Sequence, residues 1–236
     1  MLKLVSFDVW DTLLSIKPFY KSVSEELSKI IDKPQSILEI ELFKSYQRIK
    51  AVRRSGKFDC PGMVEMMREE ISKLLKVDAK ALEKATASTV KKKQHEQLVI
   101  RNTVGVLKFV KALGLKIITI GNVVFWPGSS NRTLLEKTGL SKLIDGQFYA
   151  DEIGVSKPKP EIFAYALSKF DVKPEEALHV GDSLFEDFVG AIFSHMNAAL
   201  IDKSLDKSVK LSNWNAYVLP DIKGLEQIIE ELTSQS

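Results

Sequence analysis

The chain begins with the stretch Leu2-Lys-Leu-Val-Ser-Phe-Asp8-Val-Trp10-Asp-Thr12-Leu. The apolar run from Leu2 to Val9 is typical of a short strand that is buried on both faces, as strands of parallel sheets are. Asp8 lies inside this run, where an unpaired carboxylate is costly to bury. The stretch therefore predicts a buried strand that carries an acidic group in need of a cation.

The segment that follows, residues 16–96, has a different texture. It is rich in Lys, Glu, Leu and Ile, contains almost no glycine, and places apolar residues three and four positions apart. This spacing is typical of amphipathic helices, and Pro and Gly breaks separate them. We expect helices at 18–31, 36–54, 62–76 and 79–96.

From residue 100 onward, short apolar runs alternate with helical patterns. Alternation of this kind implies parallel strands joined by crossover helices. Strands are expected at 115–120, 147–150, 177–180, 198–201 and 216–219, and helices at 104–113, 131–138, 160–170, 186–194 and 225–232.

The predicted fold is therefore α/β: a doubly wound, parallel, Rossmann-like sheet with an inserted α-helical cap domain. Residues 1–15 and 97–236 form the core domain in this interpretation, and residues 16–96 form the cap. Ligands of open parallel sheets bind at the carboxyl ends of the strands. The insertion leaves from such an end, so we expect it to act as a lid over the site.

Composition excludes several classes of protein. The 236 residues are 44% hydrophobic and 28% charged, which is ordinary for a folded domain and not for a disordered or collagen-like chain. No apolar run approaches the ~20 residues of a membrane span. The single cysteine, Cys60, excludes an internal disulfide and a Cys-rich zinc site. Without a recognisable signal peptide at the N-terminus, the sequence predicts a cytoplasmic protein with no membrane partner.

Charge is divided unevenly along the chain. Residues 16–96 hold 18 basic and 12 acidic side chains, a net charge of +6, whereas the remainder carries −3. A basic lid over the site is consistent with a small anionic substrate, although a solvated lysine-rich helical face would give the same count. The triplet Lys91-Lys-Lys93 is too short to indicate nucleic-acid binding.

Polar residues follow the buried strands in four segments: Asp8-Val-Trp-Asp-Thr12, Gly121-Asn122, Gly154-Val-Ser-Lys157-Pro-Lys-Pro-Glu and His179-Val-Gly-Asp182-Ser-Leu-Phe-Glu-Asp187. Asp8 and Asp182 can share one cation, and two carboxylates with a main-chain carbonyl and waters make a typical Mg²⁺ site. Lys157 can keep a carboxylate ionised and bind an anion. The amides of Gly121 and Asn122 and the Thr12 hydroxyl can bind phosphate oxygens. Each segment alone also fits a structural role, such as helix capping by Asp182.

Taken together and in this order, the segments resemble the haloacid dehalogenase (HAD) superfamily of hydrolases with a helical cap inserted after the first motif. The resemblance implies that Asp8 is the nucleophile of an aspartyl intermediate. It also implies that Asp182 and the main-chain carbonyl of Trp10 bind Mg²⁺, with Asp187 as a supporting acid. Lys157 matches the lysine of the third motif.

Two positions depart from the phosphatases of that superfamily. Trp10 stands where they carry a second Asp as general acid and base, and Gly121 stands where they carry Ser or Thr. Asp11 replaces the usual glycine, and its side chain is expected to point elsewhere. Because a positioned general acid contributes ~10²–10⁴ in rate, we expect a slow phosphoesterase, in which Trp10→Asp would raise the hydrolysis of alkyl phosphates.

Two alternatives remain open at this point. Dehalogenases of the superfamily also have an aromatic residue at the Trp10 position, but they need no Mg²⁺ and lack the acid that matches Asp182. The chain can also be a degenerate hydrolase that only binds ligands, with Trp10 and Phe125-Trp126-Pro127 lining an aromatic pocket.

The turn between the second and third expected helices is the candidate for substrate selection. It reads Arg53-Arg54-Ser-Gly-Lys57, and we expect Arg54 or Lys57 to reach the leaving group of the substrate. Exposed cations at a helix end, favoured there by the helix dipole, are the structural alternative.

Overall fold

The computed structural model describes residues 1–93, 95–211 and 214–234. In it, a seven-stranded sheet has the order β3-β2-β1-β4-β5-β7-β6. All neighbouring pairs are parallel except β6 and β7. The strands are β1 (Leu4–Phe7), β2 (Lys116–Gly121), β3 (Gly146–Tyr149), β4 (Ala177–Gly181), β5 (Asn197–Ile201), β6 (Val209–Leu211) and β7 (Ala216–Leu219). The doubly wound α/β fold is confirmed, with an antiparallel strand at one edge.

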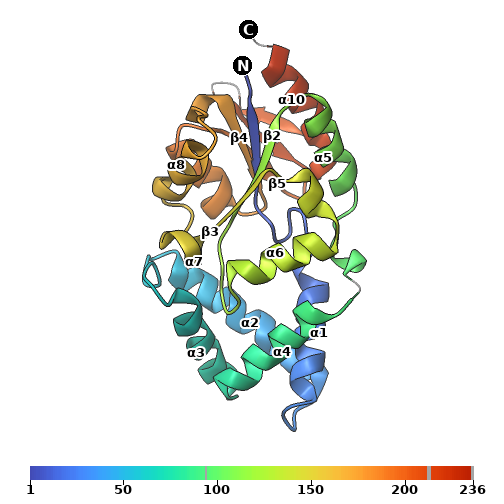
Figure 1. The fold of residues 1–236 in the computed structure, drawn as a ribbon, viewed down its shortest axis with the longest axis vertical. Helices are drawn as coiled ribbons and strands as arrows, with labels where there is room; N and C mark the ends of the chain where they lie inside the picture. Colours follow the sequence, from blue (N-terminus) through green and yellow to red (C-terminus); the bar gives the residue numbers. More distant parts are fainter. Residues whose placement is uncertain (94, 212–213, 235–236) are drawn as a thin grey trace.

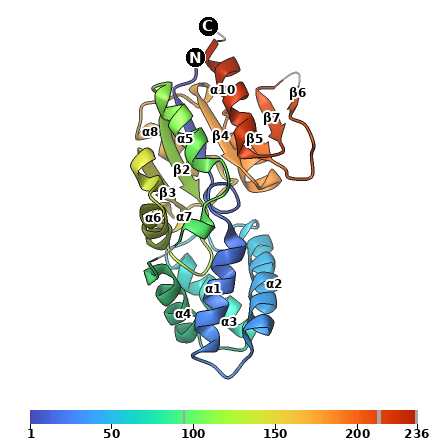
Figure 2. The same cartoon turned by 90° about the vertical axis from the view of Figure 1, so that its right-hand side faces the viewer.

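Helices cover both faces of this sheet (Figures 1 and 2). On one face lie α5 (Thr103–Ala112) and α10 (Leu225–Ser234), and on the other lie α8 (Pro160–Ser168) and α9 (Gly190–Phe193). The central strands are buried on both sides, and every residue of β1 and β4 is buried. That double burial explains why their sequences are continuous apolar runs.

Four more helices pack together below the carboxyl ends of the strands (Figure 1). They are α1 (Ile16–Ser28), α2 (Gln35–Arg53), α3 (Met63–Leu75) and α4 (Ala79–Lys91). We call them the four-helix unit. Each of the four packs against two of the others, around a core of buried residues that includes Leu27, Leu42, Met67, Ile71 and Leu82. No helix in the described part of the chain is both long and apolar enough to cross a membrane.

The two connections between the sheet and the four-helix unit run side by side. Ser15 N–H donates to the Leu98 carbonyl at 2.6 Å, and Ile100 N–H donates to the Leu13 carbonyl at 3.0 Å. This antiparallel pair lies at the segments where the sequence analysis divides core from cap. The division into two domains remains a prediction. The paired connections show that the chain leaves the sheet and returns to it at the same place.

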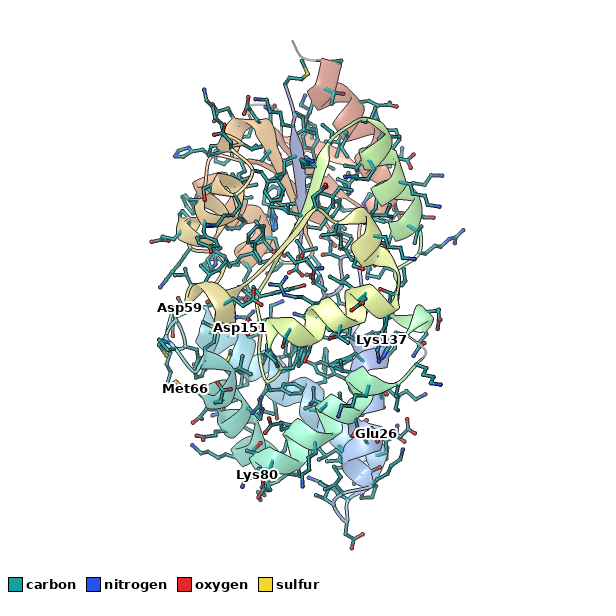
Figure 3. All side chains as sticks on the ribbon, viewed as in Figure 1. Glu26, Asp59, Met66, Lys80, Lys137 and Asp151 are labelled. Carbon is teal, nitrogen blue, oxygen red and sulfur yellow. The ribbon has the colours of Figure 1, made fainter. Side chains whose placement is uncertain are left out.

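Two polar seams flank the junction of the sheet and the four-helix unit. On one side Asp59 accepts a 3.2 Å hydrogen bond from Ser156 N–H and pairs with Lys159 at 2.7 Å. On the other side the Lys137 ammonium donates to the carbonyls of Val90 and Lys92, both at 2.7 Å. Figure 3 labels Asp59 and Lys137 at opposite ends of this junction.

Three local predictions differ from the structure. The helix expected at 79–96 ends at Lys91, because Lys92 is extended and the Lys137 ammonium takes the last carbonyls of the helix; Gln94 lies outside the described residues. The helix expected at 186–194 begins earlier, at Leu184, as a π-helical turn (η4, Leu184–Val189) that continues into α9. Strand β6 was not expected, because its three residues are all exposed.

The remaining elements connect these layers. They are α6 (Gly128–Lys137), which lies between the sheet and α4 in Figure 1, α7 (Ala150–Ile153), and the short 3₁₀ turns η1 (Glu96–Leu98), η2 (Leu140–Leu143), η3 (Pro174–Glu176) and η5 (Ile222–Gly224).

Candidate active site

Three carboxylates converge where β1 and β4 end. Asp8 follows β1 directly, Asp182 follows β4 directly, and Asp187 lies in η4. The pairing of the two strands fixes this meeting, since Asp8 N–H donates to the Val180 carbonyl at 2.8 Å. One oxygen from each of the three carboxylates lies within 4.8 Å of one from each of the others. Residues that are far apart in the sequence thus form one acidic cluster.

Lys157 neutralises two members of this cluster. Its ammonium donates to Asp8 Oδ1 at 2.8 Å, to Asp187 Oδ1 at 2.6 Å and to the Ile120 carbonyl at 2.6 Å. Burial favours the neutral amine, but Asp187 and Asp8 outweigh it and raise the pKa of Lys157 above its usual value. The lysine is therefore a permanent cation with all three of its protons in use.

The Asn122 side chain fixes the backbone from which Lys157 extends. Asn122 Oδ1 accepts from Lys157 N–H at 2.8 Å, and Asn122 Nδ2 donates to the Lys157 carbonyl at 3.0 Å and to Glu186 Oε2 at 3.3 Å. These bonds tie the loop before α8 to the end of β2. Asn122 is thus engaged by its side chain in positioning Lys157.

Asp187 has a supporting role in the carboxylate cluster. Its Oδ1 accepts from Lys157 and from His179 Nε2 at 3.3 Å, and its Oδ2 accepts from Ser183 N–H at 2.9 Å. Gly181 leaves room for it, since a Cβ there would lie 2.2 Å from the Asp187 carboxylate. Although burial opposes ionisation, Lys157 and His179 hold the pKa of Asp187 well below its usual value. Both oxygens are occupied, so this carboxylate supports its neighbours.

Asp182 and Asp8 carry the charge that remains uncompensated. Burial, followed by the charges of Asp187 and Asp8, raises the pKa of Asp182 to about 8. Burial also raises the pKa of Asp8, to about 6, although Lys157 opposes this. Within the described residues Asp182 accepts no hydrogen bond and Asp8 Oδ2 accepts none, which leaves oxygens free for a cation.

These donors fit a divalent, oxygen-preferring ion. Mg²⁺ is usually held by one or two carboxylates with carbonyls and waters, and Asp8 and Asp182 supply two carboxylates. The main-chain carbonyl of Trp10, two residues after Asp8, takes no hydrogen bond in the part of the chain described here. A bound cation would also remove the like-charge repulsion that raises the pKa of Asp182.

A small cavity of about 20 Å³ lies over the carboxylates and is closed by the four-helix unit. The residues that form it come from the sheet, namely Asp8, Asn122 and Asp182, and from α2, namely Tyr46, Lys50 and Arg53. That volume holds about one water molecule. The arrangement is therefore a narrow one, and a phosphate ester needs more room than this conformation leaves.

The α2 residues were not foreseen from the sequence. Tyr46, Lys50 and Arg53 are four and three positions apart, so they share one face of the helix. This spacing was visible in the sequence, but nothing there indicates which face of α2 meets the sheet. The two cations that were expected to reach the substrate do not line the cavity: Arg54 pairs with Glu186 at 3.2 Å, and the Lys57 ammonium lies 5.6 Å from the centre of the Phe58 ring.

Comparison with known proteins identifies the family. The family model of the haloacid dehalogenase-like hydrolases matches residues 2–192. The chain belongs to this family. A glyceraldehyde 3-phosphate phosphatase of Methanothermobacter thermautotrophicus is 28% identical over 240 residues, which cover 97% of this chain and 100% of that protein.

Solved structures of the family share the fold over the whole chain. A putative HAD-hydrolase of Bacillus subtilis bound to magnesium superimposes with a TM-score of 0.77 at 18% identity, covering 97% of this chain and 98% of that one. An L-2-haloacid dehalogenase of Xanthobacter autotrophicus with chloropropionic acid covalently bound gives 0.72 at 15% identity, and covers both chains fully. The dehalogenase shares this fold, so the fold alone does not distinguish a phosphatase from a dehalogenase.

Trp10, the first departure from the phosphatases of the haloacid dehalogenase-like family, is a packed side chain. It is 7% exposed, and its ring lies 4.9 Å from Phe19 and 5.5 Å from Trp126. Its Nε1–H donates to Asn131 Oδ1 at 3.1 Å, and the same oxygen accepts from Trp126 Nε1 at 2.8 Å. Trp10 therefore ties the sheet to α1, and an Asp in its place would lose this packing.

Gly121, the second departure, lies against Tyr149. A Cβ at Gly121 would lie 2.9 Å from two ring atoms of Tyr149, closer than real Cβ contacts allow. Neither Ser nor Thr fits there unless that ring moves, and the position cannot supply a hydroxyl to a phosphate. Thr12 is fully buried, its hydroxyl has no partner among the described residues, and it does not line the cavity.

Asp11 follows Trp10 in the left-handed region, at φ 58°. Its Oδ1 accepts from Ile16 N–H at 3.1 Å, at the start of α1, and the residue lines the edge of the cavity. The side chain thus helps to begin the first helix of the four-helix unit.

Proposed function

We propose that this hydrolase is a Mg²⁺-dependent phosphoesterase that acts on a small phosphorylated molecule through an aspartyl phosphate on Asp8. One observation carries the proposal: Asp182 lies beside Asp8 without a hydrogen-bonding partner in the described chain, and burial, followed by the charges of Asp187 and Asp8, raises its pKa. A halide leaving group gains little from a cation at this place, whereas phosphoryl oxygens are strongly stabilised by one.

The protein's own groups have separate tasks in this reaction. Lys157 holds Asp8 Oδ1 at 2.8 Å and keeps the carboxylate ionised and oriented. Asp8 attacks phosphorus, the bond to the leaving oxygen breaks, and water then hydrolyses the acyl phosphate. When bound by Asp8, Asp182 and the Trp10 carbonyl, Mg²⁺ supplies positive charge to the transferring phosphoryl group. Asp187 and Asn122 keep Lys157 in place throughout.

The proposed substrate is a small phosphate ester, and neither nucleic acid nor a membrane is part of the proposal. The net charge of +6 on residues 16–96 supports an anionic substrate, because it raises the local concentration of anions near the site. We also propose that the protein works in the cytoplasm, consistent with its single cysteine. The phosphatase named above, 28% identical, supports phosphate-ester chemistry without identifying the substrate.

The test is an assay of the purified protein on p-nitrophenyl phosphate with Mg²⁺ and after treatment with a chelator. We expect turnover that needs Mg²⁺ and that Asp8→Asn lowers by at least ~10³-fold, because the nucleophile is lost. Circular dichroism and a thermal melt of Asp8→Asn serve as the folding control. Unchanged turnover in a folded Asp8→Asn would remove Asp8 as the nucleophile.

The same preparation separates the two alternatives. Release of chloride from 2-chloropropionate without metal would identify a dehalogenase instead. Saturable ligand binding without turnover of either compound would identify a binding module. In both cases the proposed phosphoesterase is wrong.

A further inference from the structure

One cation at the cavity has no partner that accounts for its burial. Lys50 lies on α2, is partly buried and lines the same cavity as Asp8 and Asp182. Within the described residues its ammonium makes no hydrogen bond and no ion pair within 4.0 Å, and its nearest aromatic contact is the Tyr46 ring, 6.0 Å away. An ammonium has three protons to donate, and leaving them unused in a buried place is costly.

Arg53, one turn further along α2, is a cation whose two terminal nitrogens have partners, although its buried Nε–H has none in the described chain. Its guanidinium donates to the Val123 carbonyl at 2.7 Å and to Glu186 Oε2 at 2.8 Å, and the residue is 3% exposed. Arg53 therefore joins α2 to the sheet. Lys50 has no such structural task, although Glu186 and Asp182 favour its charged form.

The indole and amide side-chain donors on the sheet side of the cavity are already engaged, whereas on α2 the Arg53 Nε–H and the Tyr46 hydroxyl have no partner in the described chain. The indole N–H groups of Trp10 and Trp126 both bind Asn131, and the Asn122 amide binds Lys157 and Glu186. The sheet side thus contributes carboxylates, and its indole and amide donors already bind protein acceptors. Among the described residues that line the cavity, the cation without an ion pair or a hydrogen bond is Lys50, on the α2 side.

Phosphoryl transfer requires a hydrogen-bond donor or a cation near the leaving oxygen of the substrate. As Asp8 attacks phosphorus, negative charge develops on the leaving oxygen, which is in line with the attack and therefore on the far side of phosphorus from Asp8. A donor that faces this oxygen stabilises the transition state. Asp8 and Asp182 line the cavity from the strand ends, and α2 contributes Lys50 and Tyr46 to the same cavity.

We propose that Lys50 is the group that binds the leaving oxygen of the substrate and supplies its proton, with the Tyr46 hydroxyl as a second hydrogen-bond donor. This assignment rests on the proposed phosphoesterase activity. The bond from Asp8 to phosphorus forms, the bond from phosphorus to the leaving oxygen breaks, and its electron pair takes a proton from the Lys50 ammonium. Water then attacks phosphorus, Lys50 regains its proton from that water, and Asp8 is released with inorganic phosphate. Lys50 thus partly replaces the general acid that is missing at the position of Trp10.

Two esters with different leaving groups test the assignment. A nitrophenolate leaves without a proton, whereas an alkoxide needs one. We expect Lys50→Met to lower kcat on glycerol 3-phosphate by about 10²-fold or more and to change kcat on p-nitrophenyl phosphate by less than about threefold. KM should change less than kcat, because the charge on the leaving oxygen develops only in the transition state.

Matched variants separate this role from general damage to α2. Lys44→Met removes an exposed lysine from the same helix and should leave both substrates unaffected. Lys50→Arg keeps the positive charge but cannot release a proton, so it should recover only the part of the alkyl-ester activity that charge alone supplies. Tyr46→Phe should show a weaker form of the same selective loss. A thermal melt checks the folding of each variant, and Lys50→Gln replaces Lys50→Met if the latter does not fold.

The outcomes distinguish this assignment from the activity on which it rests. Equal losses on the two esters, or no loss, would overturn the role of Lys50 while leaving the phosphoesterase intact. If the unmodified protein with Mg²⁺ turns over neither ester, the proposed function is wrong and the role of Lys50 is wrong with it.

Discussion

The sheet and α2 approach the cavity with a lysine each, and the two lysines are held in opposite ways. Lys157, from the loop before α8 on the sheet side, is 2% exposed and binds Asp8, Asp187 and the Ile120 carbonyl. Lys50, from α2, has no hydrogen-bonding partner in the described chain. The sheet side is therefore preorganised by the fold itself, as electrostatic catalysis requires. On the α2 side, the proposed substrate would supply the missing partner of Lys50.

Arg53 connects these two regions. Its ion pair with Glu186 is buried on both sides, with side chains that are 3% and 5% exposed. Glu186 lies in η4 beside Asp187, so closure of the four-helix unit and the order of the carboxylate cluster share one contact. Opening the cavity for a substrate would expose this pair to water, where such contacts contribute little.

The largest effect is expected from removing the preorganised lysine. Lys157→Ala leaves Asp8 and Asp187 buried without their cation, and loss of one partner of a buried ion pair typically costs about 3–5 kcal/mol. Urea unfolding at neutral pH measures this loss. Lys159→Ala is the control, since the Lys159 side chain is half exposed and its buried partner Asp59 keeps the hydrogen bonds from Ser156. Similar losses in the two variants would contradict the view that Lys157 organises the sheet side.

Trp10→Asp sharpens the comparison at the boundary between the two regions. From the sequence, this change was expected to raise alkyl-phosphate hydrolysis. The structure predicts instead that losing the Trp10 ring from its contacts with Phe19 and Trp126 costs about 3–5 kcal/mol of stability, which a thermal melt would measure. Trp10→Phe, which keeps an aromatic ring, should cost much less. A stable and faster Trp10→Asp would show that this packing is unimportant.

The pH dependence of stability tests the charge that the sheet side leaves uncompensated. Folding raises the pKa of Asp182 from 3.8 to about 8. Between pH 4 and pH 8 the folded state therefore binds more protons than the unfolded state. Without metal, the free energy of unfolding should therefore fall as pH rises from about 4 to about 8. Asp8, with its pKa raised to about 6, adds to this fall over the lower part of the range.

Bound Mg²⁺ should raise the free energy of unfolding at high pH, where the metal-free protein is expected to be less stable. Mg²⁺ needs ionised ligands, so the stabilisation it gives should be larger at pH 8 than at pH 6, and at 100 times its Kd amounts to about 2.7 kcal/mol. Thermal melts over this range measure both effects. Asp182→Asn should flatten the metal-free pH profile and abolish the response to Mg²⁺, whereas Asp206→Asn, at an exposed position, should do neither. A response to Mg²⁺ that survives in Asp182→Asn would place the ion elsewhere.

The sequence predicted the sheet side far better than the α2 side, for a physical reason. Asp8 and Asp182 each follow a buried parallel strand directly, and Lys157 lies in the loop between α7 and α8. The geometry of such sheets brings the carboxyl ends of the strands together whatever the rest of the chain does. The order of the segments was therefore enough to place the three residues in one cluster. The helices of the four-helix unit were predicted just as well as separate elements.

The packing of those helices against the sheet could not be predicted from the sequence. Helical periodicity identifies the apolar face of α2, but Tyr46, Lys50 and Arg53 are polar or amphipathic and look like solvated residues in the sequence. Only tertiary packing decides that Arg53 is buried and that Arg54, its neighbour, is 39% exposed. For the same reason the hydrogen bonds of Asn122 to Lys157, and the Tyr149 ring that excludes a side chain at Gly121, could not be predicted.

The smallest effect is expected at Lys57, which the sequence offered as a substrate contact. Its side chain is exposed and lies over the Phe58 ring rather than at the cavity. Lys57→Ala should leave kcat and KM unchanged within about twofold and stability within about 0.5 kcal/mol, as is usual for surface positions. Steady-state kinetics on several phosphate esters, measured beside Lys50→Met, provide the comparison. A selective loss of activity in Lys57→Ala, but not in Lys50→Met, would mean that the turn after α2, and not its inner face, meets the substrate.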